Sequence, residues 1–141
     1  MLKIGLKSDI VNPLFTRHIK FLFMDIETLR HYCLSKNVAT EDMPFDDKTL
    51  VFRVMNKMFG LLSLDSENVS INLKCTPGYA VELRELYPDD IKPGYHMSKI
   101  HWNTVRCDGA LNDSLVRELV THSYDLIVQS LTKAQREALK S

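Results

Sequence analysis

The chain has 141 residues, of which 45% are hydrophobic and 26% charged, proportions typical of one soluble globular domain. Lys plus Arg equals Asp plus Glu at 18 each, so no overall field draws the protein to nucleic acid or an anionic membrane, and such binding needs a local patch. Three widely spaced cysteines without a CxxC pair favour reduced thiols in a cytoplasmic protein, and no apolar run approaches the roughly 20 residues of a membrane span.

Residues 1–23 differ from the rest of the chain. They carry four cations against the single acid Asp9, which gives this piece a net charge of +3 and leaves −3 for the remainder. Their apolar residues follow no helical or strand period, and Pro13 interrupts them. We interpret residues 1–23 as an N-terminal extension and residues 24–141 as the folded domain. A basic targeting peptide and an upstream addition to a protein starting at Met24 are both open alternatives for the extension.

Residues 25–74 predict a helix followed by three strands. Asp25 is a suitable N-cap, and apolar residues recur behind it at helical spacing as far as residue 37. After a loop rich in acids, strands are expected over residues 50–55, 58–64 and 69–74. Asn56-Lys57 has the length of a hairpin turn. The third strand alternates apolar and polar residues, as in an antiparallel sheet with one buried and one solvent-exposed face.

The second half of the chain adds a short helix, a strand and two further helices. Thr76-Pro77 can open the short helix, and residues 102–107 alternate like a strand. Asn112 is placed to cap a long helix, and Thr132 with Gln135 forms a capping box for a last short one. This order predicts an α+β domain, in which an antiparallel sheet of about four to six strands has helices packed on one face.

One stretch, residues 93–106, is chemically distinctive. It holds two of the five histidines and the only tryptophan, and the chain between Asp90 and Asp108 carries three cations and no acid. Cations interspersed with aromatic residues suit phosphate contacts and base stacking. Trp102 is nevertheless expected to be structural, because a tryptophan that opens an alternating strand generally packs in a core.

From Met24 onward the sequence resembles the MmcQ/YjbR family of small bacterial proteins. The resemblance rests on Lys99 and on the segments 25–33, 40–45, 72–75, 93–97, 101–105 and 122–126. Family members usually begin where Met24 stands here, in agreement with an extension over residues 1–23. The resemblance implies a compact α+β fold similar to the frataxin-like fold and to double-wing DNA-binding domains, and it brings no catalytic residue.

The resemblance and the basic stretch together favour a DNA-binding protein without catalytic activity or cofactor. The expected contact residues are cations, histidines and one tyrosine: Arg53, Lys74, Tyr95, His96, Lys99, His101 and Arg106. Arg53 and Lys74 would extend the surface if their strands were neighbours. The prediction requires cations that are far apart in the chain to meet on one face of the folded domain.

The alternative function is a frataxin-like metal-binding or protein-interaction module. Its site would be the acidic loop, because hard cations prefer clustered carboxylates, although the loop lacks DxDxDG spacing. Its four acids are Glu41, Asp42, Asp46 and Asp47. A metal held by His96 and His101 lacks a third ligand at a characteristic spacing.

Two enzymatic alternatives have weaker support. His96, Lys99 and His101 could form a pocket for a small anionic substrate, which is a third possible function. Cys75 follows Lys74, whose charge could lower the pKa of the thiol, but a buried, inert thiol at the end of a strand is the expected state.

Overall fold

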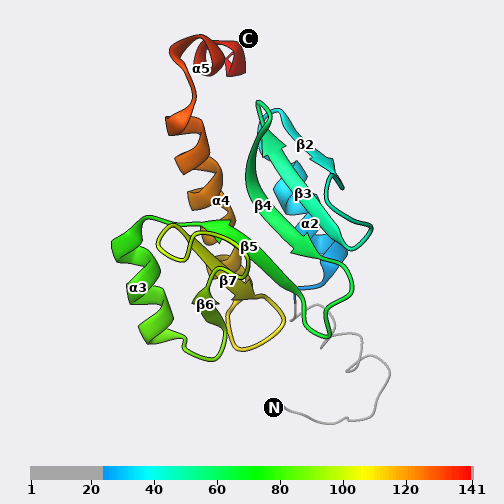
Figure 1. Cartoon of the computed structure of the whole chain (residues 1–141), viewed down its shortest axis with the longest axis vertical. Coiled ribbons are helices and arrows are strands. Elements are labelled where there is room, and N and C mark those ends of the chain that lie inside the picture. The colour runs from blue at the N-terminus through cyan, green and yellow to red at the C-terminus, as the bar shows by residue number, and fades with distance from the viewer. Residues whose placement is uncertain (1–23, 141) are drawn as a thin grey trace.

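The computed structural model of the protein describes residues 24–140. The prediction of an N-terminal extension over residues 1–23 lies outside this range. The described part contains four helices and six strands, and the strands form one antiparallel sheet in the order β2-β3-β4-β5-β7-β6. Figure 1 shows this sheet running across the molecule, with the short helix α5 at the C-terminal end. The predicted α+β class and the antiparallel sheet are confirmed.

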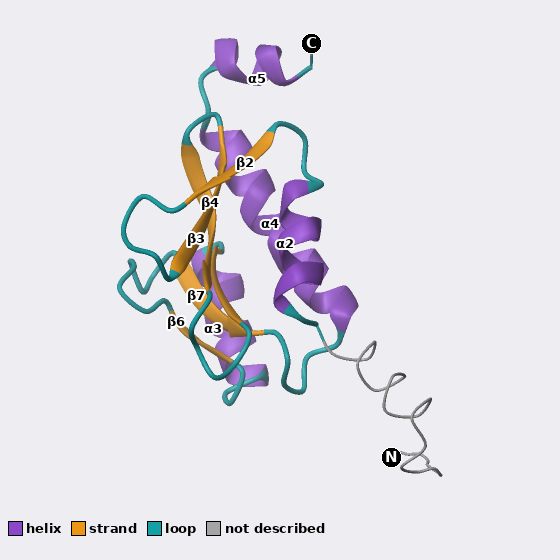
Figure 2. Ribbon diagram, turned by 90° about the vertical axis from the view of Figure 1, so that its right-hand side faces the viewer, coloured by secondary structure: helices purple, strands orange, loops and turns teal. Residues whose placement is uncertain are grey.

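The helices cover one face of the sheet. Helix α2 (Ile26–Leu34) and the long helix α4 (Asp113–Ser130) lie side by side on this face in Figure 2. Helix α3 (Pro77–Leu86) packs beside β6 and adds Ala80 and Leu83 to the same core, whereas α5 (Lys133–Leu139) buries no side chain. The opposite face of the sheet has no helix among the described residues, and we call it the open face.

The three predicted strands form, with small shifts of their ends. They are β3 (Thr49–Val54), β4 (Lys57–Ser63) and β5 (Ser70–Lys74). The hairpin turn between the first two is Met55-Asn56 rather than the predicted Asn56-Lys57, because Val54 pairs with Lys57. Both turn residues have positive φ, as a two-residue turn of type I′ requires.

Two strands were not predicted. β2 (Ala39–Asp42) carries the first acids of the segment expected to be a loop, and it pairs with β3. β6 (Ile91–Pro93) is only three residues long and pairs with β7 (Trp102–Arg106), the fourth predicted strand. Both are short edge strands, of four and three residues, and β2 has no buried residue, so neither carries a clear hydrophobic pattern in the sequence.

The predicted helix caps are confirmed. Asp25 accepts a hydrogen bond from the amide of Thr28 at 2.7 Å, and Asn112 accepts one from Leu115 at 2.8 Å. Thr132 and Gln135 form the reciprocal capping box. Thr76 holds the N-cap position of α3 without a side-chain bond. Within the described range, no helix is long and apolar enough to cross a membrane.

The main core lies between the sheet and the helices. Its largest fully buried side chains include Phe52, Phe59 and Met24. Trp102 is 9% exposed, so the prediction of a structural tryptophan is confirmed, although it lies outside this core cluster. Next to β6, the buried carboxylate of Asp90 accepts a hydrogen bond from the amide of Ala110 at 3.3 Å. Gly109 leaves room for this carboxylate because it has no side chain.

Candidate functional site

The open face changes in character from one edge of the sheet to the other. In the register of the sheet, one row of opposed residues crosses all six strands. It runs from an acid through apolar and neutral polar side chains to a cation, in the order Asp42, Val51, Leu61, Asn72, Thr104 and Lys92. Residues that share a row across antiparallel strands share a face, so this gradient belongs to one surface.

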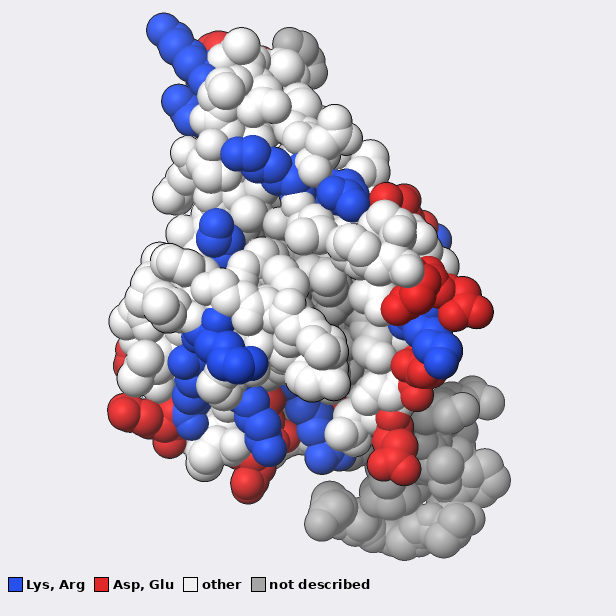
Figure 3. Space-filling view, in the orientation of Figure 1, with Lys and Arg blue, Asp and Glu red and all other residues white. Residues whose placement is uncertain are grey.

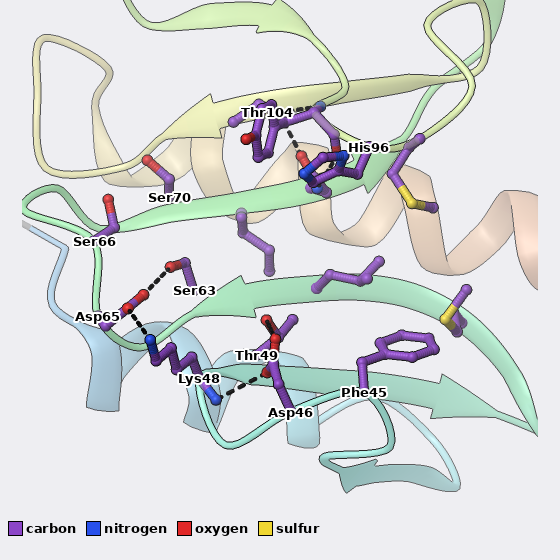
Figure 4. Close-up of a pocket in the computed structure, with 16 residues that line it drawn as sticks. Phe45, Asp46, Lys48, Thr49, Ser63, Asp65, Ser66, Ser70, His96 and Thr104 are labelled. Carbon is purple, nitrogen blue, oxygen red and sulfur yellow. Dashed lines mark hydrogen bonds and ion pairs between the residues drawn. The ribbon is translucent and has the colours of Figure 1, made fainter.

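A cavity of about 660 Å³ lies on the open face, within the range of small-ligand sites. Its floor comes from β4 and β5, and its two sides come from residues 45–49 and residues 95–97. Figure 4 shows Phe45 and His96 on opposite sides of this space, with Ser63 and Ser70 on the strands between them. The cavity is therefore built from segments that are distant in the chain.

The side formed by residues 95–97 is fixed to the sheet by hydrogen bonds. Thr104 accepts a bond from the amide of Tyr95 at 2.9 Å, and its hydroxyl also donates to the Asn72 side chain. The amide group of Asn72 in turn donates to the carbonyl of Tyr95 at 3.2 Å. Both backbone polar groups of Tyr95 are thus held by side chains of β5 and β7. We call Asn72, Thr104 and Tyr95 the loop network.

The loop network sets the position of an aromatic pair. His96 has φ of 60°, a left-handed conformation uncommon for a residue other than glycine. The Tyr95 and His96 rings lie with their centroids 4.0 Å apart and an interplanar angle of 50°. Tyr95 is 67% exposed, so one face of this pair is accessible to a ligand. Strained or left-handed residues of this kind concentrate at binding sites.

A second set of bonds holds the far end of the same loop to helix α3. The Arg84 guanidinium donates to the buried Asn103 side chain at 2.7 Å, and also to the carbonyls of Lys99 and Trp102. Lys99 donates through Nζ to the carbonyl of Gly94 at 3.1 Å. These contacts fix the loop of residues 94–101 at both ends, and residues 95–97 of this loop form one side of the cavity.

The predicted cations differ in whether a carboxylate neutralises them. Arg53 is paired with Asp42 at 2.9 Å, and Arg106 is paired with Asp108 at 3.1 Å. Within residues 24–140, Lys74 and Lys99 have no carboxylate partner, and neither has the neighbouring Lys92. Lys74, Lys92 and Lys99 therefore keep charges that no carboxylate neutralises, although Nζ of Lys99 also donates to the carbonyl of Gly94.

The predicted residues do not all form one patch. Lys74 and Arg106 share the open face but stand opposite Trp102 and Ser70 respectively, which separates them by about 13 Å along the strands. Arg53 of β3 does not extend the surface of Lys74 on β5, because β4 lies between these two strands. His101 is exposed at the end of the loop and, like Lys99, does not line the cavity, whereas Tyr95 and His96 do.

Charge is sorted across the cavity. Asp46 and Asp65 line the side of β3 and β4, where Lys48 lies 3.7 Å from Asp65. Figure 3 shows Asp and Glu along the right-hand rim of the hollow with basic side chains among them, Lys and Arg to its left and above it, and further acids at the lower left edge. A ligand that spans the cavity would thus meet cations on one side and carboxylates on the other.

Sequence reasoning missed most of the cavity. Phe45 is 62% exposed on one rim, and Leu61, Asn72 and Thr104 lie on or beside the floor. Strand alternation placed Asn72 on a solvent-exposed face, but it did not show which residues lie opposite, and the family resemblance assigned no binding role to Phe45, Asn72 or Thr104. Thr104 belongs to the basic stretch but carries no charge, so a search for cations and aromatic residues passes over it.

The acidic loop does not assemble into a cluster. Glu41 accepts from Arg30 of α2 at 2.7 Å, while Asp42 pairs with Arg53 on the open face. Asp46 accepts from the amide of Lys48 at 2.9 Å, and this bond lowers the pKa of its carboxyl. No group of three or more His, Cys, Asp or Glu side chains among residues 24–140 could hold a metal ion. The metal-binding alternative gains no support from this arrangement.

The thiols are not poised for nucleophilic chemistry. Burial raises the pKa of Cys33 to about 12 and that of Cys75 to about 11, and it also raises the pKa of Cys107. Cys75 is buried, as expected, and the nearby charge of Arg84 only partly offsets the effect of burial on its pKa. A thiolate at neutral pH is therefore disfavoured at each of the three positions.

The fold and the site define a small α+β domain, in which a sheet face without a helix among residues 24–140 carries a cavity beside lysines that no carboxylate neutralises. Comparison with known proteins identifies its family. The family model described as YjbR matches residues 34–126, and the chain belongs to this family. It is 33% identical over 116 residues to the protein named Uncharacterized protein YjbR of Escherichia coli strain K12, covering 82% of this chain and 98% of that one.

Other relatives agree with this membership. The protein named Uncharacterized protein YbdF of Escherichia coli O157:H7 is 33% identical over 115 residues, covering 81% of this chain and 93% of that one. Among solved structures, Deinococcus radiodurans protein DR2400, described with domain DUF419, matches with a TM-score of 0.78 and 37% identity over 84% of this chain and 89% of that one. A Pseudomonas syringae protein matches with a TM-score of 0.61 and 27% identity over 73% and 98%. The predicted family is confirmed.

Proposed function

We propose that the domain binds DNA through one half of its open face, formed by β5, β7, β6 and residues 94–101. The observation that carries this proposal is the sorting of charge. Lys74, Lys92 and Lys99 have no carboxylate partner within the described range, whereas Asp46 and Asp65 line the other side of the cavity. A polyanion would be attracted to the first side and excluded from the second.

The spacing of the lysines suits separate phosphates. Lys92 lies opposite Thr104, which lies opposite Asn72, so Lys92 and Lys74 are two strands and two residues apart. That displacement corresponds to about 12 Å with ordinary sheet dimensions. The exposed ring of Tyr95 is carried by the loop beside them and is available for stacking on a base.

The expected affinity is modest and sensitive to salt. The sequence from residue 24 onward has a net charge of −3, and only three lysines are offered as phosphate contacts. For three contacts on a single strand, the logarithm of the association constant falls with the logarithm of salt concentration with a slope of about −2. Binding of this kind needs neither a cofactor nor a catalytic group, and the proposed role is binding without catalysis. A cytoplasmic site of action, expected from cysteine usage, stays a prediction.

Fluorescence anisotropy with a labelled oligonucleotide tests the proposal. Titrations at several salt concentrations compare the wild type with K74E and K92E, because within residues 24–140 neither lysine side chain makes a hydrogen bond or ion pair that the fold would lose; the bond of Lys74 to Ser123 comes from its backbone amide. K133E is the matched control, since Lys133 is exposed on α5 at the other end of the molecule (Figure 1). We expect weaker binding and a shallower salt dependence in the two test variants alone. Equal affinity for all four proteins, or no binding by the wild type, would reject the proposal.

A further inference from the structure

The cavity itself has a chemistry different from that of its basic side. The lysine that lines it, Lys48, is already paired, because its ammonium group lies 3.7 Å from the carboxylate of Asp65. The remaining lining is apolar, aromatic or neutral polar, and none of Lys74, Lys92 and Lys99 belongs to it. A phosphate placed inside would therefore meet two carboxylates and one paired cation. The interior suits a neutral, flat group with a polar edge.

The walls offer faces for such a group. Tyr95 and Phe45 are 67% and 62% exposed on opposite sides of the cavity, and the His96 ring lies against that of Tyr95. Aromatic side chains spaced across a cavity bind planar rings by stacking. Between them, Leu61 and Met58 supply an apolar floor, and hydroxyl groups supply hydrogen bonds to a polar edge (Figure 4), from Thr49, Ser63 and Ser70.

The site is also ordered before any ligand arrives. The loop network fixes both backbone groups of Tyr95 through Asn72 and Thr104, and Arg84 ties the far end of the loop to Asn103. The backbone that carries the Tyr95 ring is therefore already ordered when a ligand binds. Preorganisation of this kind raises affinity by reducing what must be ordered on binding.

We propose that the cavity receives one unstacked base of a single DNA strand, between Phe45 and the Tyr95–His96 pair. This inference rests on the proposed DNA binding and adds the strandedness and the place of the base. The free lysines lie outside the cavity on the Tyr95 side, so a strand whose base enters the cavity can keep its phosphates on Lys74 and Lys92. A base within a duplex is stacked on both faces and does not reach the floor.

The test uses the full chain and four probes: a dodecamer of thymidylate, its duplex with the complementary strand, a dodecamer of base-free deoxyribose phosphate, and thymidine monophosphate. Y95A removes the stacking ring, and L61W fills the floor. I100A is the control for the first, because Ile100 is 64% exposed in the same loop but does not line the cavity. V81W is the control for the second, since Val81 is exposed on α3. Circular dichroism confirms that each variant is folded.

We expect Y95A and L61W to weaken binding of the thymidylate strand by about 5- to 150-fold, the loss typical of one stacked base. The salt dependence should stay that of the wild type, because the phosphate contacts remain. I100A and V81W should bind like the wild type. The duplex and the base-free strand should both bind more weakly than the thymidylate strand.

Failure of this inference is distinct from failure of the proposed function. If the wild type binds DNA with dependence on Lys74 and Lys92 but Y95A and L61W bind equally well, the cavity takes no base. Equal affinity for the duplex or the base-free strand gives the same conclusion. If thymidine monophosphate binds as tightly as the strand and loses affinity in Y95A, the ligand is a free nucleotide. If the wild type binds no probe, both proposals are wrong.

Discussion

Replacing Thr104 with valine should loosen the wall of the cavity while leaving the core intact. The hydroxyl of Thr104 accepts from the amide of Tyr95 at 2.9 Å and donates to the side chain of Asn72. Each neutral hydrogen bond contributes about 1 kcal/mol net. Water can replace the lost partner of Tyr95, which is at the surface, so we expect T104V to lower the free energy of unfolding by about 1–2 kcal/mol. For a domain of this size that corresponds to a fall in Tm of about 4–8 °C.

Thermal unfolding followed by circular dichroism measures this effect, with T49V as the matched control. Thr49 lies on the same face, but its hydroxyl makes only a 3.4 Å contact with Asp46. The same change of hydroxyl to methyl should therefore cost less than about 0.5 kcal/mol there. If T104V and T49V melt within 2 °C of each other (about 0.5 kcal/mol), the loop network does not hold the wall, and the argument for a preordered site is wrong.

Three further predictions concern packing, charge and thiols. G94A should lower stability in urea by about 1–3 kcal/mol, because a Cβ at Gly94 would lie 2.8 Å from the Cβ of Trp102. The hydrogen bond from Arg30 lowers the pKa of Glu41 in the folded protein. The pair therefore stabilises the fold fully above the pKa of an unfolded glutamate, and its contribution is lost as pH falls through the lower folded pKa. The urea midpoints of the wild type and E41Q should differ at pH 7 and converge in acid. Ellman's reagent should label none of the three buried thiols before unfolding and all three afterwards.

The elements of the fold could be predicted where a local pattern was strong. Helix α4 combines a capping Asn112 with a long apolar stripe, and the β3–β5 meander combines alternation with short turns. The two edge strands β2 and β6 were missed because they are short, at four and three residues, and are defined by pairing with the next strand and not by a pattern in their own residues. The hairpin was displaced by one residue for a similar reason, since register is set by pairing.

The candidate site could be predicted only in part. Tyr95 and His96 were found because aromatic residues among cations are visible in the sequence, and both line the cavity. Arg53 and Arg106 were chosen for their charge, but the sequence does not show that Asp42 and Asp108 neutralise them. Phe45 and Leu61 were not predicted as site residues, because an exposed aromatic residue in a loop and a leucine in a strand are common in proteins without a site there.

The sequence by itself determined the family, the class of fold and the chemistry of residues 93–106, because each depends on residue types and on short-range spacing. The tertiary structure alone decided which charges remain free and which side chains face one another. Those facts depend on strand order and register: β4 separates Arg53 from Lys74, and the pairing of β5 with β7 brings Asn72 to Thr104. Contacts between residues far apart in the chain are set by the whole core, so a local pattern cannot specify them.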